Sequence, residues 1–395
     1  MKVPLKLVAP LVAALAIAAC NAGGNSTMPG ATGQMGAQAA HIPQWQANHT
    51  ARAACVGSRV GQAQCDVLIA TGVQRNGAGL SAANLEDAYK LPSSTKGKKA
   101  SVYIVDAYDN PNVASDFAQY RSVMGLPVGT LNKYNQEGQK SNYPAGNVGW
   151  GVEIDLDVEM VSASCPNCTV NLVEANSNNS GDLGSAEQEA VKLGATIVSN
   201  SYTGGADESD YDTKGVTYLA SAGDNGYGLE EPASFASVVA VGGTNLTADS
   251  GNKRGWDETV WPDSGGGCSN DSKPSWQKDP DCTFRTGADI SAQASQEVAE
   301  YDTYGEGGWL IIGGTSVSSP FIAGVFALAG NSTKQNGGEN FWKLSKKKIK
   351  KDLYYISSGN DGSCNGEYLC TAGTQQFGNY SGPTGWGTPH GIGAF

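Results

Sequence analysis

The sequence has few charged residues, little positive charge and very few histidines. Charged side chains make up 16% of the 395 residues, with 26 Lys and Arg against 38 Asp and Glu, and there are three His. This composition argues against nucleic acid as the main partner, because phosphate binding needs clustered cations. The net charge of −12 fits an acidic working environment, and the 53 glycines with 39% hydrophobic residues are typical of a loop-rich exported protein with a large core.

Long apolar runs are also absent beyond the first twenty residues, since no later stretch approaches the ~20 residues that span a bilayer. Residues 1–20 have a basic start, an apolar stretch and small residues before Cys20, which predicts an export signal. Because Ile17-Ala18-Ala19-Cys20 is similar to a bacterial lipobox, we expect a lipoprotein-type signal peptide with lipidation at Cys20. The alternative is an ordinary signal peptide that contains a cysteine.

The N-terminal sequence also predicts where the protein works. Residues 21–40 are small and polar, as in a flexible tether, and we assign residues 21–78 to this tether and a short N-terminal segment. We expect a monomeric bacterial protein that is either secreted or a cell-envelope lipoprotein. The lipid anchor would then be its only contact with the membrane.

Cysteines number nine, and eight remain once Cys20 is set aside. In an exported chain, local pairs of cysteines indicate short-range disulfides. A zinc site at residues 165–168 is the alternative, but no second pair of ligands lies nearby. The predicted pairs are Cys55 with Cys65, Cys165 with Cys168, Cys268 with Cys282, and Cys364 with Cys370.

Apolar runs alternate with amphipathic stretches from about residue 79 onward. Runs rich in Val and Ile predict strands at 101–106, 169–175, 195–202, 216–221 and 237–241. Helical patterns lie between them, near 113–123, 153–164, 185–193 and 316–329. Near-continuous apolar strands separated by helices predict an α/β fold, with a parallel sheet covered by helices on both faces.

Polar residues follow several of these strands. Asp106, the segment 199–204 and Asp224 all lie where a predicted strand ends. In parallel sheets the functional residues gather at the carboxyl ends of the strands. We therefore expect the chemistry of this protein at that edge of the sheet.

Ser316 is the candidate nucleophile. It follows Gly313-Gly314-Thr315 and precedes a small apolar run that predicts a buried helix. At a helix start, unpaired backbone N–H groups and the helix dipole favour developing negative charge. The alternative is a helix cap, a position in which Ser and Thr are common.

Histidine cannot easily serve as the base for this serine. His41 and His49 lie beside the tether, and His390 lies in a turn near the C-terminus. A serine hydroxyl needs a base within hydrogen-bond reach. One alternative that stays open is a histidine-dependent subtilisin-like protease that uses Asp106 and His390.

Carboxylates are the other candidate bases. Glu153 and Asp157 are four residues apart and share one face of a predicted helix. Two adjacent carboxyls repel, which raises one pKa and lets the pair share a proton at acid pH. The alternative is a charged surface stripe, for which Asp155 and Glu159 are the better candidates.

Three motifs together resemble one family. Glu-x-x-x-Asp at 153–157, Ser-Ala-Gly-Asp-Asn-Gly at 221–226 and Gly-Gly-Thr-Ser at 313–316 match, in order, the motifs of the sedolisin (serine-carboxyl peptidase) family. The resemblance extends from Gly79 to the C-terminus and implies a single catalytic domain, residues 79–395, with a subtilisin-like fold. It implies a secreted, acid-acting serine endopeptidase whose substrates are proteins or peptides.

The resemblance also implies a role for each matching residue. Ser316 would be the nucleophile, Glu153 the base, Asp157 its partner and Asp224 the oxyanion donor. A carboxylic acid that is kept neutral by its surroundings can donate a hydrogen bond, which a carboxylate cannot. The alternative for Asp224 is a residue that closes a turn between Gly223 and Gly226.

Substrate contacts are expected along one strand. By analogy with the subtilisin-like arrangement, the substrate-binding residues would be Ser199, Ser201 and Tyr202. A further alternative for the whole chain is a lipid-anchored, non-catalytic binding protein on a protease fold.

No cofactor is required by this chemistry, and calcium is the one metal that the resemblance suggests. Tyr355 and Ser381 stand where the family has the calcium carboxylates, and calcium prefers charged oxygen ligands. Ile356 and Asp352 are weak candidates for a metal site, and Asp361 is another compensating carboxylate.

Overall fold

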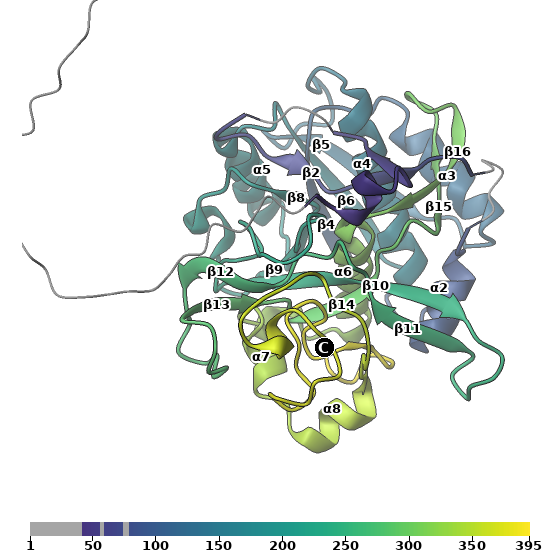
Figure 1. The fold of residues 1–395 in the computed structure, drawn as a ribbon. Helices are drawn as coiled ribbons and strands as arrows, with labels where there is room; N and C mark the ends of the chain where they lie inside the picture. The colour runs from purple at the N-terminus through teal and green to yellow at the C-terminus, as the bar shows by residue number, and fades with distance from the viewer. Residues whose placement is uncertain (1–41, 56–58, 74–78) are drawn as a thin grey trace, which may run out of the picture. The chain divides into compact units, whose positions relative to one another are not determined.

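The computed structural model describes residues 42–55, 59–73 and 79–395. Contacts among these residues define one compact unit (Figure 1). The predicted signal peptide, the lipidation site Cys20 and the tether lie outside the described residues.

An eight-stranded sheet forms the centre of this unit. The strand order is β11-β10-β9-β7-β4-β6-β5, with β14 also paired to β10. The neighbouring pairs are parallel except β10 with β11. The strands are β4 (Ser101–Ala107), β5 (Thr130–Asn135), β6 (Thr169–Ala175), β7 (Ile197–Asn200), β9 (Thr217–Ser221), β10 (Val238–Ala248), β11 (Trp256–Val260) and β14 (Ile290–Gln293).

Helices cover both faces of this sheet. α4 (Val148–Ser164) and α6 (Thr315–Ala329) pack against each other and against β4, while α5 (Ser180–Lys192) packs on β4 and β6 away from this pair. α2 (Ala82–Tyr89) and α3 (Val113–Val123) pack on α4. This arrangement confirms the predicted α/β class.

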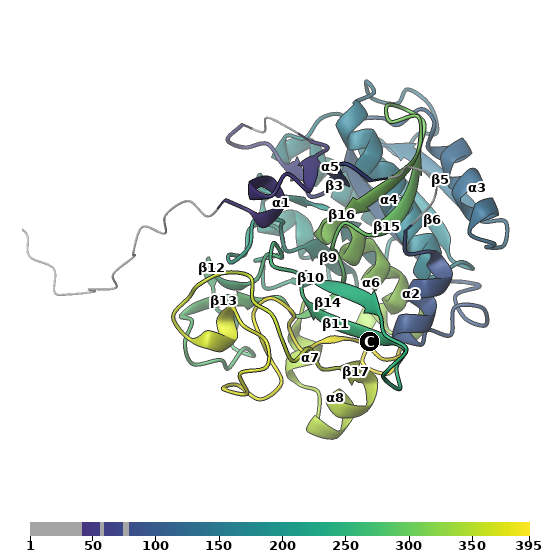
Figure 2. The same cartoon turned by 45° about the vertical axis from the view of Figure 1, so that its right-hand side comes forward.

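A second sheet joins the N-terminal segment to the rest of the unit. Its order is β1 (Ala51–Ala53), β3 (Leu68–Ala70), β16 (Gly308–Gly313) and β15 (Val298–Asp302), all antiparallel. Strand β15 also packs on α3 and α4 (Figure 2). We expected the peptidase domain to begin at residue 79, but these earlier strands belong to the same unit.

The remaining elements are short. They are α1 (Gln44–Ala47), β2 (Gln64–Cys65), β8 (Tyr202–Thr203), β12 (Gly267–Ser272), β13 (Phe284–Gly287), α7 (Glu339–Trp342), α8 (Lys346–Asp352), β17 (Leu353–Tyr354), β18 (Thr388–Pro389) and 3-10 turns at Glu208–Tyr211, Ser332–Lys334 and Glu367–Leu369. The structure joins all four pairs of cysteines that the sequence suggested.

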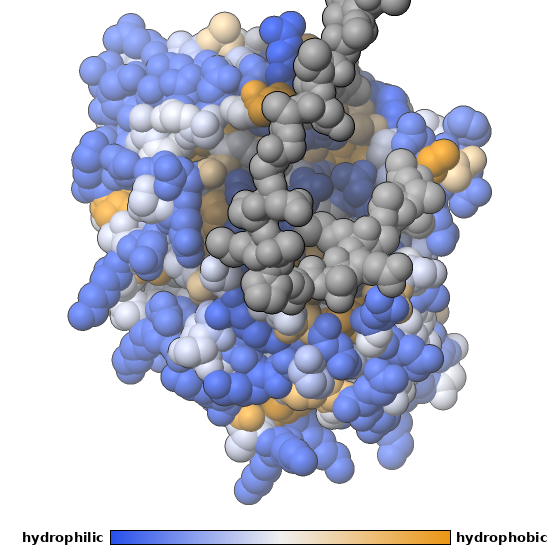
Figure 3. Space-filling model, turned by 60° about the vertical axis from the view of Figure 1, so that its left-hand side comes forward, coloured by the Kyte–Doolittle hydropathy of each residue, from blue (hydrophilic) through white to orange (hydrophobic). Residues whose placement is uncertain are grey.

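Among the described residues, no helix combines the length and the apolar character that crossing a bilayer requires. On the face drawn in Figure 3, most of the coloured surface is hydrophilic and hydrophobic residues lie in scattered groups.

Two helices bring the functional motifs together. α4 begins where the Asn147 side chain accepts a hydrogen bond from the Trp150 amide, and it is buried along nearly its whole length. α6 begins after Gly314, whose φ of 110° lies in the region that favours glycine. Because these two buried helices pack side by side, residues 163 positions apart in the chain become neighbours.

Candidate active site

Ser316 lies in the first turn of α6 and is fully buried. Its hydroxyl donates a hydrogen bond of 2.9 Å to Oε2 of Glu153 on α4. It also lies 3.4 Å from the carbonyl oxygen of Ser201, at the end of the central sheet. The sequence-predicted nucleophile and base are therefore within hydrogen-bond reach of each other, and both are shielded from water.

Glu153 and Asp157 lie one helical turn apart, as the spacing suggested. Burial raises the pKa of Glu153 well above its usual value, and repulsion by Asp157 raises it further. Asp157 Oδ1 accepts a hydrogen bond of 2.7 Å from Ser201 Oγ, and burial with repulsion by Asp106 raises the pKa of Asp157 well above its usual value. Two buried carboxyls that repel each other favour a state in which they share one proton.

Asp106 is a third carboxyl beside this pair. It lies one residue before the end of β4, is fully buried, and neither of its oxygens has a hydrogen-bond partner among the described residues. Burial raises its pKa to about 8. Its charge would in turn raise the pKa values of Glu153 and Asp157, so a neutral Asp106 is the form that fits this site.

Asp224 lies beside the start of α6. Its Oδ1 accepts hydrogen bonds from the backbone N–H and the hydroxyl of Thr315, at 2.7 and 2.9 Å. Oδ2 has no partner among the described residues. Burial raises the pKa of Asp224 well above its usual value, and repulsion by Asp66 adds to this effect. A proton on Oδ2 is therefore favoured, and it is free to be donated.

The predicted substrate-binding strand contributes its backbone. The Ser201 carbonyl contacts the Ser316 hydroxyl, as described above. Ser199, by contrast, contacts Ser319 Oγ inside the core, and the Tyr202 hydroxyl contacts Asn200 and Tyr211. The side chains at 199 and 202 thus contact other buried residues, and neither is a hydrogen-bond partner of the Ser316 hydroxyl.

Asp66 is a site residue that the sequence gave no reason to select. Its Oδ2 accepts a hydrogen bond of 2.7 Å from Ser221 Oγ, and Oδ1 accepts one of 3.1 Å from Thr203 Oγ1. It lies in the N-terminal segment, which we expected to be separate from the catalytic domain. Its one sequence signal is the neighbouring Cys65, which fixes this part of the chain by a disulfide.

The interpretation of Asp155 and Glu159 as a charged surface stripe is wrong. Both are fully buried, because α4 runs through the interior with its other face against β15 and α3. Asp155 accepts a hydrogen bond of 2.6 Å from Asn110, and Glu159 accepts one of 3.1 Å from the Tyr301 amide. They form a second carboxyl cluster with Asp116 of α3 and with Glu300 and Asp302 of β15.

The described histidines do not meet the nucleophile. The ring of His390 stacks on Tyr354 with centroids 4.4 Å apart, and its backbone N–H donates to the Asp352 carbonyl. His390 and His49 are both exposed, whereas Ser316 is buried against Glu153. His41 lies outside the described residues. This geometry disfavours the histidine-dependent alternative.

A family model of the Subtilase family matches residues 134–354, more than half of the chain. The chain belongs to the subtilase family. Kumamolisin of Bacillus sp. (strain MN-32) is 27% identical over 355 residues, covering 78% of this chain and 62% of that protein. Sedolisin of Pseudomonas sp. (strain 101) is 27% identical over 349 residues, covering 76% and 58%.

Structural similarity identifies the branch of the family. The structure of Pseudomonas sedolisin, a serine-carboxyl proteinase in complex with two molecules of pseudo-iodotyrostatin, has a TM-score of 0.65 and 26% identity. The match covers 80% of this subtilase and 96% of that chain. Together these relatives make the chain a sedolisin-type subtilase with the predicted subtilisin-like fold. It spans about three fifths of the length of kumamolisin and of sedolisin.

The residues present do not fit a calcium ion of the kind that the resemblance suggests. Ser381, at one carboxylate position, has its hydroxyl 2.7 Å from Thr384 Oγ1, and Tyr355 holds the other position. Burial raises the pKa of Asp361 well above its usual value, so this carboxyl favours its neutral form. Asp352 contacts Lys351. Within residues 42–55, 59–73 and 79–395, no group of three or more His, Cys, Asp or Glu could hold a metal.

Proposed function

We propose that this protein is an acid-acting serine endopeptidase that hydrolyses peptide bonds in proteins. Ser316 is the nucleophile, Glu153 the general base, Asp157 the partner of Glu153, and Asp224 the oxyanion donor. The observation that carries the proposal is the 2.9 Å hydrogen bond from the buried Ser316 hydroxyl to Glu153, at a site where neither described histidine contacts the serine.

The reaction follows from these positions. Glu153 removes the proton of Ser316 as the hydroxyl oxygen attacks the carbonyl carbon of the substrate, while the proton that Glu153 shares with Asp157 moves onto Asp157. The tetrahedral oxyanion is held by the proton on Asp224 and by the backbone N–H of Ser316. Glu153 then gives its proton to the leaving amine, and water attacks the acyl ester in the same way.

Two ionisations set the limits of the active pH range. Asp224 donates a hydrogen bond only while it is protonated, and its raised pKa keeps it protonated through the acid range. Activity is lost when it ionises at higher pH, because losing one oxyanion donor lowers kcat by about 10²–10³. Glu153 must at the same time accept a proton, which sets the acid limit.

Export of the protein is part of this proposal. Four disulfides in one chain are typical of an oxidising compartment. The N-terminal signal and lipidation site at Cys20 remain predictions, as do secretion or anchoring at the cell envelope and the monomeric state.

The proposal is tested with acid-denatured casein as substrate. Wild-type protein should release peptides at pH 3–5, and Ser316→Ala should lower the rate by at least about 10³ because no nucleophile remains. Unchanged digestion by Ser316→Ala, or no digestion by the wild type at any pH from 3 to 9, would contradict it.

A further inference from the structure

Residues 62–66 of the N-terminal segment lie as a strand between two other segments. On one side, Gln64 and Cys65 pair antiparallel with Thr203 and Tyr202. On the other side, the Ala63 amide donates to the Asn178 carbonyl at 2.8 Å, and Asn178 Nδ2 donates to the Ala63 carbonyl at 2.7 Å. Extended peptide ligands bind to sheet edges through hydrogen bonds of the same kind.

The strand delivers one peptide bond to the catalytic groups. The Asp66 amide donates to the Ser201 carbonyl at 3.2 Å, the same oxygen that the Ser316 hydroxyl approaches. The Asp66 carbonyl oxygen and Asp224 Oδ2 both lie close to Gly314. A Cβ atom added to this glycine would be 1.9 Å from the carbonyl oxygen and 2.6 Å from Oδ2. The carbonyl between residues 66 and 67 thus lies beside the proposed oxyanion donor.

The Asp66 side chain fills a polar pocket next to the nucleophile. The hydroxyls of Ser221 and Thr203 both donate to its carboxyl group, which is almost fully buried. Burial raises the pKa of Asp66 to about 7, with a further contribution from Glu230, so Asp66 is uncharged at acid pH. The pocket therefore accepts a short carboxylic acid in its neutral form.

We propose that residues 62–66 occupy the substrate groove in the register of a substrate, with Asp66 in the primary specificity pocket. The Asp66–Val67 bond is then the bond presented for cleavage, and the pocket formed by Ser221 and Thr203 selects peptides with Asp or Glu before the cleaved bond. This inference rests on the proposed function.

Cleavage of this bond is a balanced hydrolysis. Ser316 Oγ forms an ester with the Asp66 carbonyl carbon, the bond to the Val67 nitrogen breaks, and Glu153 passes the serine proton to that nitrogen. Water then hydrolyses the ester, which leaves a carboxyl group on Asp66 and restores the hydroxyl of Ser316. Val67 becomes a new N-terminus.

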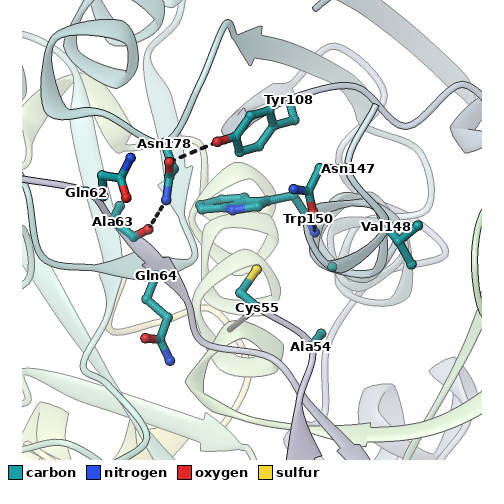
Figure 4. A pocket seen from close by; sticks show the side chains of 11 residues that line it. Ala54, Cys55, Gln62, Ala63, Gln64, Tyr108, Asn147, Val148, Trp150 and Asn178 are labelled. Carbon is teal, nitrogen blue, oxygen red and sulfur yellow. Dashed lines mark hydrogen bonds between the residues drawn. The ribbon is translucent and has the colours of Figure 1, made fainter. Parts of the chain in front are cut away.

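Two further contacts fix the segment to the rest of the molecule. The Cys55–Cys65 disulfide closes the loop that carries the strand, and the Trp45 indole N–H donates to the Asp224 carbonyl at 3.1 Å. The groove is not completely filled. A pocket of about 400 Å³ remains between residues 62–64 and the first turn of α4, bordered by Tyr108, Trp150 and Asn178 (Figure 4).

The experiment follows self-cleavage of the full chain. Wild type, Ser316→Ala and variants at position 66 are incubated at pH 4, and the products are identified by N-terminal sequencing and intact mass. Wild type should yield a chain that begins at Val67, and Ser316→Ala should not. Asp66→Asn keeps an acceptor oxygen and should cleave within about threefold of wild type. Asp66→Leu should be about tenfold slower, because both pocket hydroxyls lose their acceptor.

Controls separate the pocket from folding and from general activity. Glu208→Leu changes an exposed carboxylate and should leave self-cleavage unchanged. The same preparations are tested on casein, with cleavage sites mapped by mass spectrometry. Asp and Glu should precede the cut bonds more often than Leu, and Ser221→Ala should reduce this preference about threefold.

Two results overturn the inference while sparing the proposed function. One is casein digestion at acid pH by a wild-type chain that never acquires an N-terminus at Val67. The other is casein cleavage with no preference for Asp or Glu. If casein and the chain itself both stay intact, the proposed function fails and this inference fails with it.

Discussion

Replacing one acid of the second carboxyl cluster by its amide should stabilise the protein at neutral pH. The cluster lies outside the candidate active site, between α4, β15 and α3. No ion pair between described residues includes its members. They are Asp116, Asp155, Glu159, Glu300 and Asp302, all buried. Neither oxygen of Glu300 has a hydrogen-bond partner among the described residues.

The direction of the effect follows from the pKa shifts. Burial raises the pKa of Asp155, Glu159 and Glu300 well above their usual values, and their mutual repulsion adds to it. A group whose pKa is higher in the folded state stabilises that state fully below its unfolded pKa. The stabilisation is lost as the pH rises toward the folded pKa. The free energy of unfolding should therefore fall between about pH 4 and neutral pH.

The size of the effect is set by the number of retained protons. Each proton that is bound only in the folded state lowers the free energy of unfolding by about 1.4 kcal/mol for every unit by which the pH rises. Two such protons lower the free energy of unfolding by about 5.5 kcal/mol over two pH units, which is comparable with the ~5–15 kcal/mol of a whole domain. Because Glu300→Gln removes one of them, the variant should melt on the order of 5 °C above its parent at pH 6.5.

The assay is thermal unfolding by circular dichroism from pH 3.5 to 7, in the Ser316→Ala background to prevent self-digestion. Glu300→Gln and Asp155→Asn should each flatten the fall of Tm with pH, whereas the exposed Glu208→Gln should follow the parent curve. A parent Tm that rises from pH 4 to 7, or a slope unchanged in both cluster variants, would refute the reasoning.

Two further predictions concern the oxyanion donor and a buried ion pair. Asp224→Ala should lower kcat on casein by about 10²–10³. Asp224→Asn should keep more activity and extend it to higher pH, because its amide N–H donates a hydrogen bond at any pH. Equal rates for the two variants would count against the role of Asp224 as oxyanion donor. Arg285→Ala leaves Asp289, its partner at 2.6 Å, buried and unpaired, and should reduce the free energy of unfolding by about 3–5 kcal/mol. In urea unfolding, Lys192→Ala at an exposed ion pair should change it by less than about 1 kcal/mol, and a similar loss in both variants would contradict the argument.

Much of the fold could be predicted from the sequence because its signals are local. The apolar runs at 101–106 and 169–175 are strands β4 and β6, and the run after Ser316 is the buried helix α6. Boundaries were less well predicted. α4 begins at Val148, five residues before the expected start, because Asn147 caps it despite two glycines in its first turn.

The candidate site could be predicted in part. The order of three motifs selected Ser316, Glu153 and Asp224, which the structure brings together around the start of α6. Acidic residues on a helix usually indicate a solvated face, so burial of Asp155 could not be foreseen. The burial of Asp155 depends on protonation of its carboxyl group and on the acidic residues of β15, which lie about 145 residues further along the chain.

The position of Asp66 also lay beyond the sequence. Nothing in residues 42–73 carries a motif of the family, and a strand that completes a groove is defined only by its two neighbours in space. Those neighbours are segments near 178 and 202, which are far from it in the chain. Tertiary contacts, rather than any local pattern, determine this part of the site.

The central claim is that carboxyl groups, and no imidazole, move the protons of catalysis. The most direct test is the pH dependence of kcat/KM for casein-derived peptides in wild type, Glu153→Gln and His390→Ala. We predict a maximum in the acid range, a loss of about 10²–10⁴ in Glu153→Gln, and an unchanged profile in His390→Ala. A maximum at neutral or alkaline pH that vanishes in His390→Ala while Glu153→Gln stays active would contradict the account.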